Sequence, residues 1–213
     1  MLTVHRQHRL LGRRVETWSV AVPRGWIPPG ASTIPFADQR RLSGAGRLLA
    51  RRVLGRKLGL PPHRVPITVD ADGRPCLPNG DYHCGDYHCG GYDFSLSHSG
   101  DRVVLAVAAG LRVGVDLERL DGQACRIEVA RKVFAAREYE SLVRADRRHY
   151  PRRWYRIWTT REAYCKALGL GALRIAAALD ERGPRWSRAT VPAPDDYMCS
   201  VVAVADHHRR SWT

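Results

Sequence analysis

The sequence has few lysines and no long hydrophobic run. Among 35 lysine and arginine side chains, lysine occurs only at positions 57, 132 and 166. No apolar stretch approaches the roughly 20 residues that a membrane-spanning helix requires, and residues 1–9 lack the apolar core of a secretory signal peptide. We therefore expect a cytoplasmic protein with no membrane partner.

Cysteine is also scarce, and its spacing is irregular. The six cysteines show no framework spacing, and without a secretory signal they are expected to be reduced thiols. Two of them belong to a direct repeat in which Gly80–Cys84 is followed at once by Gly85–Cys89. Histidine and cysteine are adjacent in each copy, unlike the spaced ligand pairs of zinc sites. We interpret the repeat as a duplicated surface loop.

Acidic side chains are few relative to basic ones. The chain has 213 residues, a 44% hydrophobic fraction and a net charge of +14, which indicate a folded protein of one domain or two small ones. A basic surface favours nucleic acid, a membrane surface or an acidic protein as partner. The sequence has no Gly-x-x-x-x-Gly-Lys-Ser/Thr loop, so nothing favours phosphoryl transfer from another nucleotide. It also has no nucleic-acid-binding signature with interleaved aromatics. An arginine-rich nucleic-acid-binding module without catalysis therefore rests on charge alone, and we keep it as the alternative function.

Hydrophobic periodicity and breaker residues predict a mixture of helices and strands. Helices are expected over residues 36–58, 125–133, 136–144 and 151–168, the last with Pro151 in its first turn and Gly169 at its end. Strands are expected over residues 67–69, 102–108, 113–117, 188–191 and 197–204. The break at residues 109–111 is either a hairpin or the boundary between two halves of the chain.

Two short motifs place charged side chains on common faces. Asp116 and Glu118 are two residues apart, so in a strand both side chains point to the same side. Glu162 and Lys166 are four residues apart, so in a helix they also share a face, with Trp158 one turn earlier. If this strand packs against this helix, three carboxylates and one lysine meet. Three hard oxygen donors beside a cation are suited to holding magnesium against a phosphate ester.

Each motif also has an ordinary structural explanation. Asp116 and Glu118 could lie on the exposed face of a half-buried strand, and Glu162 with Lys166 could be a surface ion pair worth a few tenths of a kcal/mol. Trp158 on the same helical stripe favours a packed face over a solvated one. Ser97 and His98 are adjacent, which does not suit a serine nucleophile with a histidine base. We interpret Ser97-His98-Ser99, with Gly100, as a short turn that cradles phosphate.

Taken together, these motifs resemble the signature of the 4′-phosphopantetheinyl transferases of the surfactin-synthetase-activating type. The carboxylate pair and the Trp-x-x-x-Glu-x-x-x-Lys motif are joined by three further elements, in the family's order and at similar distances. These are Gly73–Pro78, Phe94–Gly100, and Phe134 followed by Arg137-Glu138-Tyr139. The resemblance extends from about Phe36 to about Gly171. The family usually has a shorter connection where this chain has its repeat.

The resemblance implies an α+β fold of two similar α/β halves in a pseudo-twofold arrangement, with the active site between them. It favours the boundary interpretation of residues 109–111. Residues 1–110 would then form an N-terminal half that binds coenzyme A. Residues 111–213 would form a C-terminal half that carries the magnesium site and docks the carrier protein.

The resemblance also implies a role for each matched residue. Coenzyme A would be bound by Arg40, Arg41, Arg74, Pro75, Ser97, His98, Asp116 and Lys166. Magnesium would be bound by Asp116, Glu118 and Glu162. The catalytic residues would be His98, Glu138, Glu162 and Lys166. Glu138 matches a family position for which a part in deprotonating the acceptor has been suggested, although a helix-surface carboxylate is an equal interpretation.

The implied reaction is Mg²⁺-dependent transfer of 4′-phosphopantetheine from coenzyme A to a serine of an apo acyl or peptidyl carrier protein. Adenosine 3′,5′-bisphosphate would be released. Because such carriers are acidic around the modified serine, part of the arginine surface would steer docking. The two-half length implies a monomer that serves peptidyl or polyketide carriers of secondary metabolism, with no nucleic acid as partner.

Overall fold

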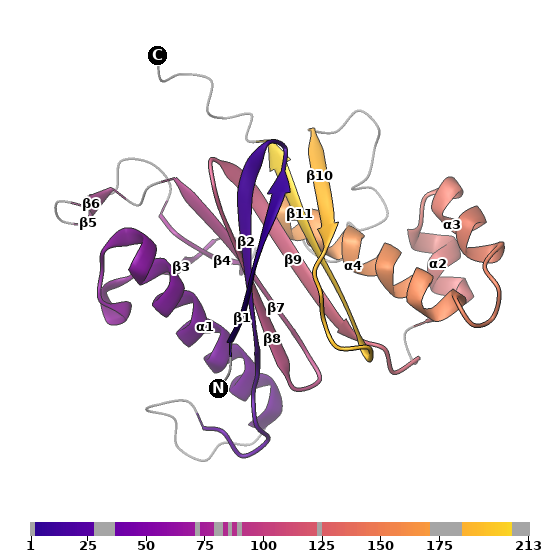
Figure 1. Ribbon diagram of the computed structural model, residues 1–213, viewed down its shortest axis with the longest axis horizontal. Coiled ribbons are helices and arrows are strands. Elements are labelled where there is room, and N and C mark those ends of the chain that lie inside the picture. The colour runs from indigo at the N-terminus through magenta and orange to yellow at the C-terminus, as the bar shows by residue number, and fades with distance from the viewer. Residues whose placement is uncertain are drawn as a thin grey trace.

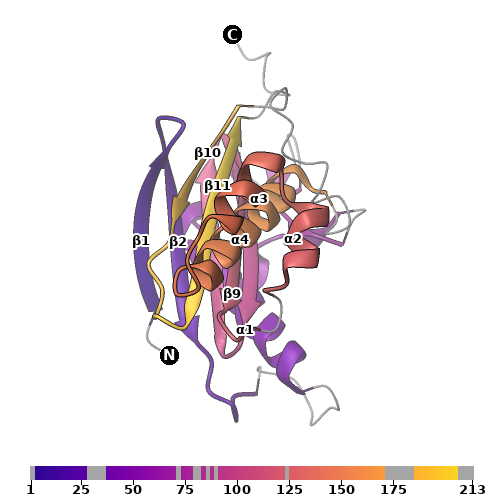
Figure 2. The ribbon, with the colours of Figure 1, turned by 90° about the vertical axis from the view of Figure 1, so that its right-hand side faces the viewer.

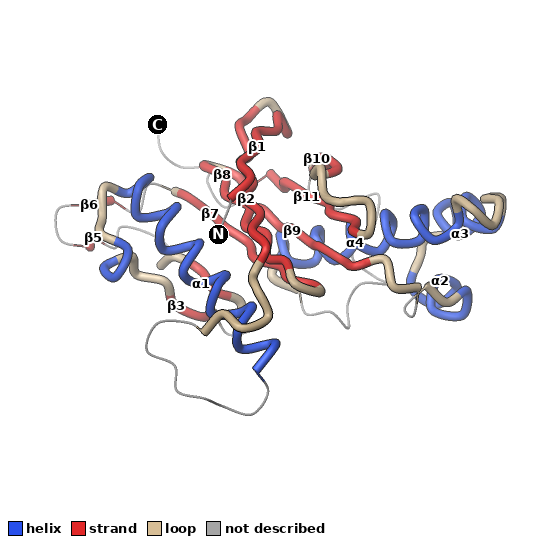
Figure 3. Tube along the Cα trace, turned by 60° about the horizontal axis from the view of Figure 1, so that its bottom comes forward, coloured by secondary structure: helices blue, strands red, loops and turns tan. Residues whose placement is uncertain are grey.

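The chain folds into two antiparallel sheets that share one core and are flanked by helices. The structure, a computed structural model, describes residues 3–27, 37–70, 73–78, 83–84, 87–88, 91–122, 125–170 and 185–205. In Figure 3 the strands run between helix α1 on one side and helices α2–α4 on the other. The expected α+β fold class is confirmed. None of the helices in these ranges is long and apolar enough to cross a membrane.

The first sheet has the strand order β1 (Thr3–Leu10), β2 (Arg13–Ala21), β8 (Arg102–Ala109) and β7 (Tyr92–Ser99), all antiparallel. Helix α1 (Ala37–Leu58) packs on β7 and β8 (Figure 1). The sequence analysis assigned no strand before α1. Four of the eight residues of β1 are arginine or histidine, and β1 is exposed along nearly its whole length, so the usual apolar alternation of a strand is absent there.

The second sheet has the strand order β10 (Trp186–Thr190), β11 (Tyr197–Ala205) and β9 (Leu111–Arg119). Helix α4 (Tyr150–Leu168) packs across β9 and β11. Gly169 ends α4 in the left-handed conformation, with φ of 72°, as the sequence predicts. Helices α2 (Ile127–Val133) and α3 (Ala136–Val143) pack beside α4 around buried Trp154, on the side of the sheets away from β1 (Figure 2).

Short elements complete the described chain. They are a 3₁₀ turn at Pro62–Arg64, the β3–β4 pair (Thr68–Val69 with Pro75–Cys76) and the β5–β6 pair (His83–Cys84 with Tyr87–His88). The last pair joins the backbones of the two repeat copies as a hairpin. The rest of the repeat lies outside the described residues, so its interpretation as a surface loop stays a prediction.

The chain passes from the first sheet to the second at Gly110, whose φ of 66° turns β8 directly into β9. The break expected at residues 109–111 is therefore the point where the chain changes sheet. The division into a coenzyme A-binding half and a carrier-docking half stays a prediction.

Strands β7 and β9 lie side by side, yet they belong to different sheets. Alternate side chains of β7 accept hydrogen bonds from alternate backbone N–H groups of β9. We call these four side chains the β7 ladder: Asp93, Ser95, Ser97 and Ser99 accept from the amides of Val113, Val115, Leu117 and Arg119 at 2.7, 3.1, 3.2 and 3.0 Å. The ladder satisfies the β9 amides that a neighbouring strand would otherwise pair, and it joins the two sheets through side chains.

The ladder corrects one prediction. Ser97-His98-Ser99 is not a turn but the end of strand β7, and the turn begins only at Gly100; its phosphate-binding role stays a prediction. Polar residues in a row normally indicate a turn or loop. In β7, serines at every second position point to the same side of the strand, and each of them accepts a hydrogen bond from a backbone amide of β9. The polar side chains are there because they connect the two sheets.

Helix α4 approaches β9 at Gly114. A Cβ atom at Gly114 would lie 1.8 Å from the backbone oxygen of Ala163 and 2.6 Å from the backbone nitrogen of Ala167. Only a residue without a side chain allows this contact. This close approach lets a side chain of α4 reach Asp116, which lies two residues further along β9.

We predict that Gly114→Ala lowers the melting temperature, because the added methyl group must push α4 away from β9. Overpacking of this kind typically costs about 1–3 kcal/mol. Gly25→Ala is the matched control, since a Cβ atom there meets no atom within 4 Å. Thermal unfolding followed by circular dichroism measures both variants. Equal melting temperatures for Gly114→Ala and the parent would show that β9 and α4 are not in direct contact.

Candidate active site

Asp116 and Lys166 meet where β9 and α4 cross. Lys166 Nζ lies 2.6 Å from Asp116 Oδ1 and also donates to Ser97 Oγ at 3.1 Å. The hydroxyl of Ser97 donates to the same Asp116 oxygen at 2.9 Å. Asp116 is only 3% exposed. The sequence motifs therefore do bring the predicted strand carboxylate and the predicted helix ammonium together.

Asp116 Oδ2 is buried and has no hydrogen-bond partner among the described residues. A buried carboxylate oxygen without a partner loses its hydration and regains nothing, which costs free energy. Asp116 Oδ1 thus accepts hydrogen bonds from Lys166 and Ser97, whereas Asp116 Oδ2 can still accept from an additional positively charged group.

Glu118 and Glu162 lie within electrostatic reach of Asp116. Burial raises the pKa of Glu118 to about 7, and the Asp116 carboxylate adds to that rise, whereas a hydrogen bond from Ser99 Oγ opposes it. Burial also raises the pKa of Glu162, again with a contribution from Asp116. Burial opposes the charge on Lys166, but the attraction of Asp116 outweighs it and raises the pKa of the ammonium. The site therefore holds more negative charge than one lysine neutralises.

We define the carboxylate cluster as Asp116, Glu118 and Glu162. Within the ranges that the structure describes, no three His, Cys, Asp or Glu side chains converge closely enough to hold a metal ion, and the ammonium of Lys166 occupies one side of Asp116. The chemistry of the cluster nevertheless fits a hard divalent cation. All three donors are carboxylate oxygens, and one oxygen of Asp116 has no hydrogen-bond partner among the described residues. Burial, with a contribution from the Asp116 charge, raises the pKa of both Glu118 and Glu162.

A pocket opens beside Lys166, between strand β7 and the C-terminal end of α4. Its lining residues are Gly73, Arg74, Pro75, Ser95, Leu96, Lys166, Gly169 and Leu170. The predicted residues Arg74 and Pro75 thus lie in the same pocket as Lys166. The Arg74 guanidinium is held by Asp93 at 3.0 Å and by the backbone oxygens of Phe94 and Val113 at 2.9 and 3.0 Å. Arg74 therefore ties β7 to β9 as well as lining the pocket.

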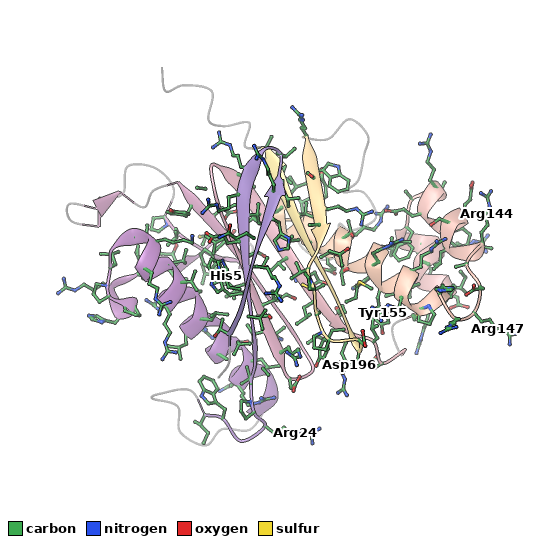
Figure 4. The ribbon with its side chains drawn as sticks, viewed as in Figure 1. His5, Arg24, Arg144, Arg147, Tyr155 and Asp196 are labelled. Atoms are coloured by element: carbon green, nitrogen blue, oxygen red, sulfur yellow. The ribbon has the colours of Figure 1, made fainter. Side chains whose placement is uncertain are left out.

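The predicted basic pair on α1 is split between two environments. Arg40 is exposed. Arg41 is 5% exposed, and its guanidinium donates to the backbone oxygens of Val22 and Pro23. Arg41 also lines a second pocket, together with Val22, Pro23, Arg24, Gly100, Asp101, Arg119, Asp196 and Tyr197. Figure 4 labels Arg24 and Asp196 on two separate segments of the chain at the lower edge of that view.

His98 lies between α1 and the carboxylate cluster. It is exposed on β7, and its Nε2 is 3.5 Å from Ser43 Oγ on α1. Partial burial lowers its pKa, and the Lys166 ammonium lowers it further. A neutral imidazole at this position can donate one hydrogen bond or accept one. The turn expected at His98 is absent, and the predicted part of His98 in binding coenzyme A stays a prediction.

Glu138 is held in a different contact. Its Oε2 accepts from Arg161 Nε at 2.7 Å, from Arg161 Nη2 at 2.6 Å and from the Ala135 amide at 2.9 Å. Arg161 is 1% exposed and also stacks over Phe134. On a helix, neighbouring residues are turned by about 100°, so Arg161 projects to a different side of α4 from Glu162. This contact favours a structural role for Glu138, as a clamp between α3 and α4.

Two parts of the site were missed by sequence reasoning. One is the β7 ladder, which the spacing Asp93-x-Ser95-x-Ser97-x-Ser99 could have indicated as one polar strand face. The other is Arg161, which precedes Glu162 directly but reads as one more arginine in an arginine-rich chain.

Comparisons with known proteins agree with this geometry. Residues 112–208 match the model of the 4′-phosphopantetheinyl transferase superfamily, and residues 31–110 match that of the 4′-phosphopantetheinyl transferase N-terminal region. The chain is 34% identical over 185 residues to the 4′-phosphopantetheinyl transferase HetI of Nostoc sp., covering 82% of this chain and 75% of HetI. It is 26% identical over 172 residues to psf-1 of Bacillus pumilus, also a 4′-phosphopantetheinyl transferase, covering 81% and 69%.

A vertebrate relative is matched over a smaller share of its length. The L-aminoadipate-semialdehyde dehydrogenase-phosphopantetheinyl transferase of Xenopus laevis is 33% identical over 146 residues, which are 64% of this chain and 46% of that protein. The first family model covers β9, α4 and β11, and with them the whole carboxylate cluster.

We predict that Glu138→Gln lowers the melting temperature, because it removes the carboxylate charge that Nε and Nη2 of the buried Arg161 contact. Removing one partner of a buried pair typically costs about 3 kcal/mol. Glu138→Gln combined with Arg161→Met should recover most of the loss, since an apolar side chain of similar length needs no partner. Glu140→Gln is the matched control, because Glu140 and its partner Arg144 are 60% and 79% exposed. If Glu138→Gln has the same melting temperature as the parent, Glu138 does not stabilise the contact between α3 and α4.

Proposed function

This chain belongs to the 4′-phosphopantetheinyl transferase superfamily and is of the Sfp-like type, and on that basis we propose its reaction. It transfers the 4′-phosphopantetheine group of coenzyme A to a serine hydroxyl of an apo carrier protein and releases adenosine 3′,5′-bisphosphate. The observation that carries the proposal is the meeting of Asp116 and Lys166, within the matched region, beside a pocket that opens between β7 and the C-terminal end of α4.

The substrate would lie with its diphosphate at the crossing of β9 and α4. Lys166 is a point charge on a flexible stem, and its side chain is 30% exposed, so the ammonium can donate to a diphosphate oxygen. His98, Arg40 and Arg41 supply further donors on the α1 side. Arg74 and Pro75 line the pocket on the other side of Lys166. We assign these residues to coenzyme A binding, together with Ser97 and Asp116, which hold Lys166 in place.

Asp116, Glu118 and Glu162 would hold Mg²⁺, which when bound supplies positive charge to the diphosphate oxygens. Glu162 is our candidate for the general base. Burial and Asp116 raise its pKa, which makes its carboxylate a better proton acceptor near neutral pH. Glu162 takes the proton of the serine hydroxyl as the serine oxygen bonds to the β-phosphorus of coenzyme A. The bond from that phosphorus to the leaving phosphate oxygen breaks, and Lys166 stabilises the charge that develops there.

The carrier protein would approach over a basic surface. Arg144 and Arg147 project from the helical lobe of α2–α4 into solvent (Figure 4), and Arg152 on α4 is exposed as well. Such charges raise association rates with an acidic partner more than they raise affinity. We propose acidic peptidyl or polyketide carriers as acceptors and a monomer acting in the cytoplasm. Neither the family models nor the relatives support the nucleic-acid-binding alternative.

Incubation with coenzyme A, Mg²⁺ and a panel of apo carriers should add one phosphopantetheinyl group to at least one carrier, as intact mass spectrometry would show. Asp116→Ala, Glu118→Ala and Glu162→Ala should each abolish the mass gain while keeping the parent melting temperature within a few degrees. EDTA should abolish it reversibly.

Glu140→Gln is the control, because Glu140 is an exposed carboxylate on α3 whose ion-pair partner is Arg144. Near-parent turnover of any of the three cluster variants in excess Mg²⁺ would refute the metal assignment. Failure to modify any carrier, with coenzyme A left intact, would refute the transfer itself.

A further inference from the structure

Two hydroxyl groups of the β7 ladder each contact a carboxylate of the cluster. Ser97 Oγ accepts from the Leu117 amide at 3.2 Å and donates to Asp116 Oδ1 at 2.9 Å. Ser99 Oγ accepts from the Arg119 amide at 3.0 Å and donates to Glu118 Oε2 at 3.2 Å. The same two-step connection, from β9 amide to serine to β9 carboxylate, therefore occurs twice, two residues apart.

The amide bond fixes the direction of each hydroxyl proton. A serine hydroxyl has one proton to donate and accepts through its lone pairs. When the backbone N–H of Arg119 occupies a lone pair of Ser99 Oγ, the remaining proton is directed at Glu118. A hydroxyl proton aimed at a carboxylate favours its ionised form, and the hydrogen bond from Ser99 does oppose the rise in the pKa of Glu118.

Asp116 and Glu118 need such a restraint because they repel each other. Both side chains leave the same face of β9, and burial removes much of the water that would screen them. Without an anchor, the longer and more exposed Glu118 would rotate away from Asp116. Lys166 and Ser97 hold Asp116, whereas Ser99 is the ladder residue that holds Glu118.

We propose that Ser99 is a positioning residue for the metal site: it presets the Glu118 carboxylate for a divalent cation through the rigid backbone of β9. The proposal rests on the proposed function, in which Glu118 is a metal ligand. Groups that orient metal ligands in this way typically contribute about 10-fold to 100-fold in metal affinity. Ser99 thus belongs to the metal site, and the phosphate-binding role considered for it from sequence alone is reassigned.

Ser95 provides the matched control. It accepts from the Val115 amide at 3.1 Å, so it makes the same ladder bond to β9, but the β9 residue just before Val115 is Gly114, which carries no carboxylate. Ser95→Ala therefore removes a ladder bond without removing a contact to the cluster. Comparing Ser99→Ala with Ser95→Ala separates the orientation of Glu118 from the general cost of a weakened ladder.

The experiment is Mn²⁺ binding to the full chain, measured by the loss of the free-ion electron paramagnetic resonance signal, with and without coenzyme A and with no carrier present. Without coenzyme A, we expect Ser99→Ala to bind Mn²⁺ about 10-fold more weakly than the parent, and Ser95→Ala to bind within twofold of it; the two serines are compared in this condition because Ser95 also lines the pocket beside Lys166. Ser99→Thr keeps the hydroxyl and should restore parent affinity. Ser99→Cys, with a weak donor of similar size, should lose affinity as Ser99→Ala does, and it replaces that variant if Ser99→Ala fails to fold.

The outcomes separate this inference from the proposed function. If the parent binds no Mn²⁺ in either condition, the metal assignment itself is wrong and this inference falls with it. If the parent binds Mn²⁺ but Ser99→Ala, or Ser99→Cys in its place, binds as tightly as Ser95→Ala, the positioning role is wrong and the metal assignment stands.

Discussion

The structure depends on how the amide groups of β9 are satisfied. On one side β9 pairs with β11 in an ordinary antiparallel sheet, and on the other its amides donate to the side chains of Asp93, Ser95, Ser97 and Ser99. A side-chain joint lets two sheets meet where a backbone ladder would have merged them. Because serine hydroxyls both accept and donate, Ser97 and Ser99 also donate hydrogen bonds to the β9 carboxylates of Asp116 and Glu118. One set of hydrogen bonds therefore fixes the fold and the site together.

The charges of the site follow from that joint. Asp116, Glu118 and Glu162 lie in a partly buried space where Lys166 pairs with Asp116. Burial first, and the Asp116 charge second, raise the pKa of both Glu118 and Glu162. Holding like charges together costs stability, which a bound cation would offset. Gly114 contributes by letting the α4 backbone contact β9 directly. A site that is under-compensated without its ligand is what a diphosphate-metal enzyme requires.

Sequence alone predicted the fold class, four helices within a few residues of their bounds, and the meeting of Asp116 with Lys166, because periods of two and four residues determine which side chains share a face. It did not predict β1 or β2; in β1, arginine and histidine at four of the eight positions replace the apolar alternation. It mistook the end of β7 for a turn, because consecutive polar residues before a glycine are typical of turns. The sequence also did not predict that Arg161 pairs with Glu138. The chain has many arginines, and only the packed structure shows that this one is buried.

The central claim is that β9 and α4 together form a divalent-metal site at which Lys166 and the carboxylates share a diphosphate. A crystal structure of the protein with coenzyme A and Mn²⁺, with anomalous data, tests it most directly. The account predicts one anomalous peak at bonding distance from Asp116, Glu118 and Glu162, in contact with the diphosphate, with the Lys166 ammonium on a diphosphate oxygen. A diphosphate bound elsewhere, or a peak away from these carboxylates while Lys166 keeps its contact with Asp116, would contradict it.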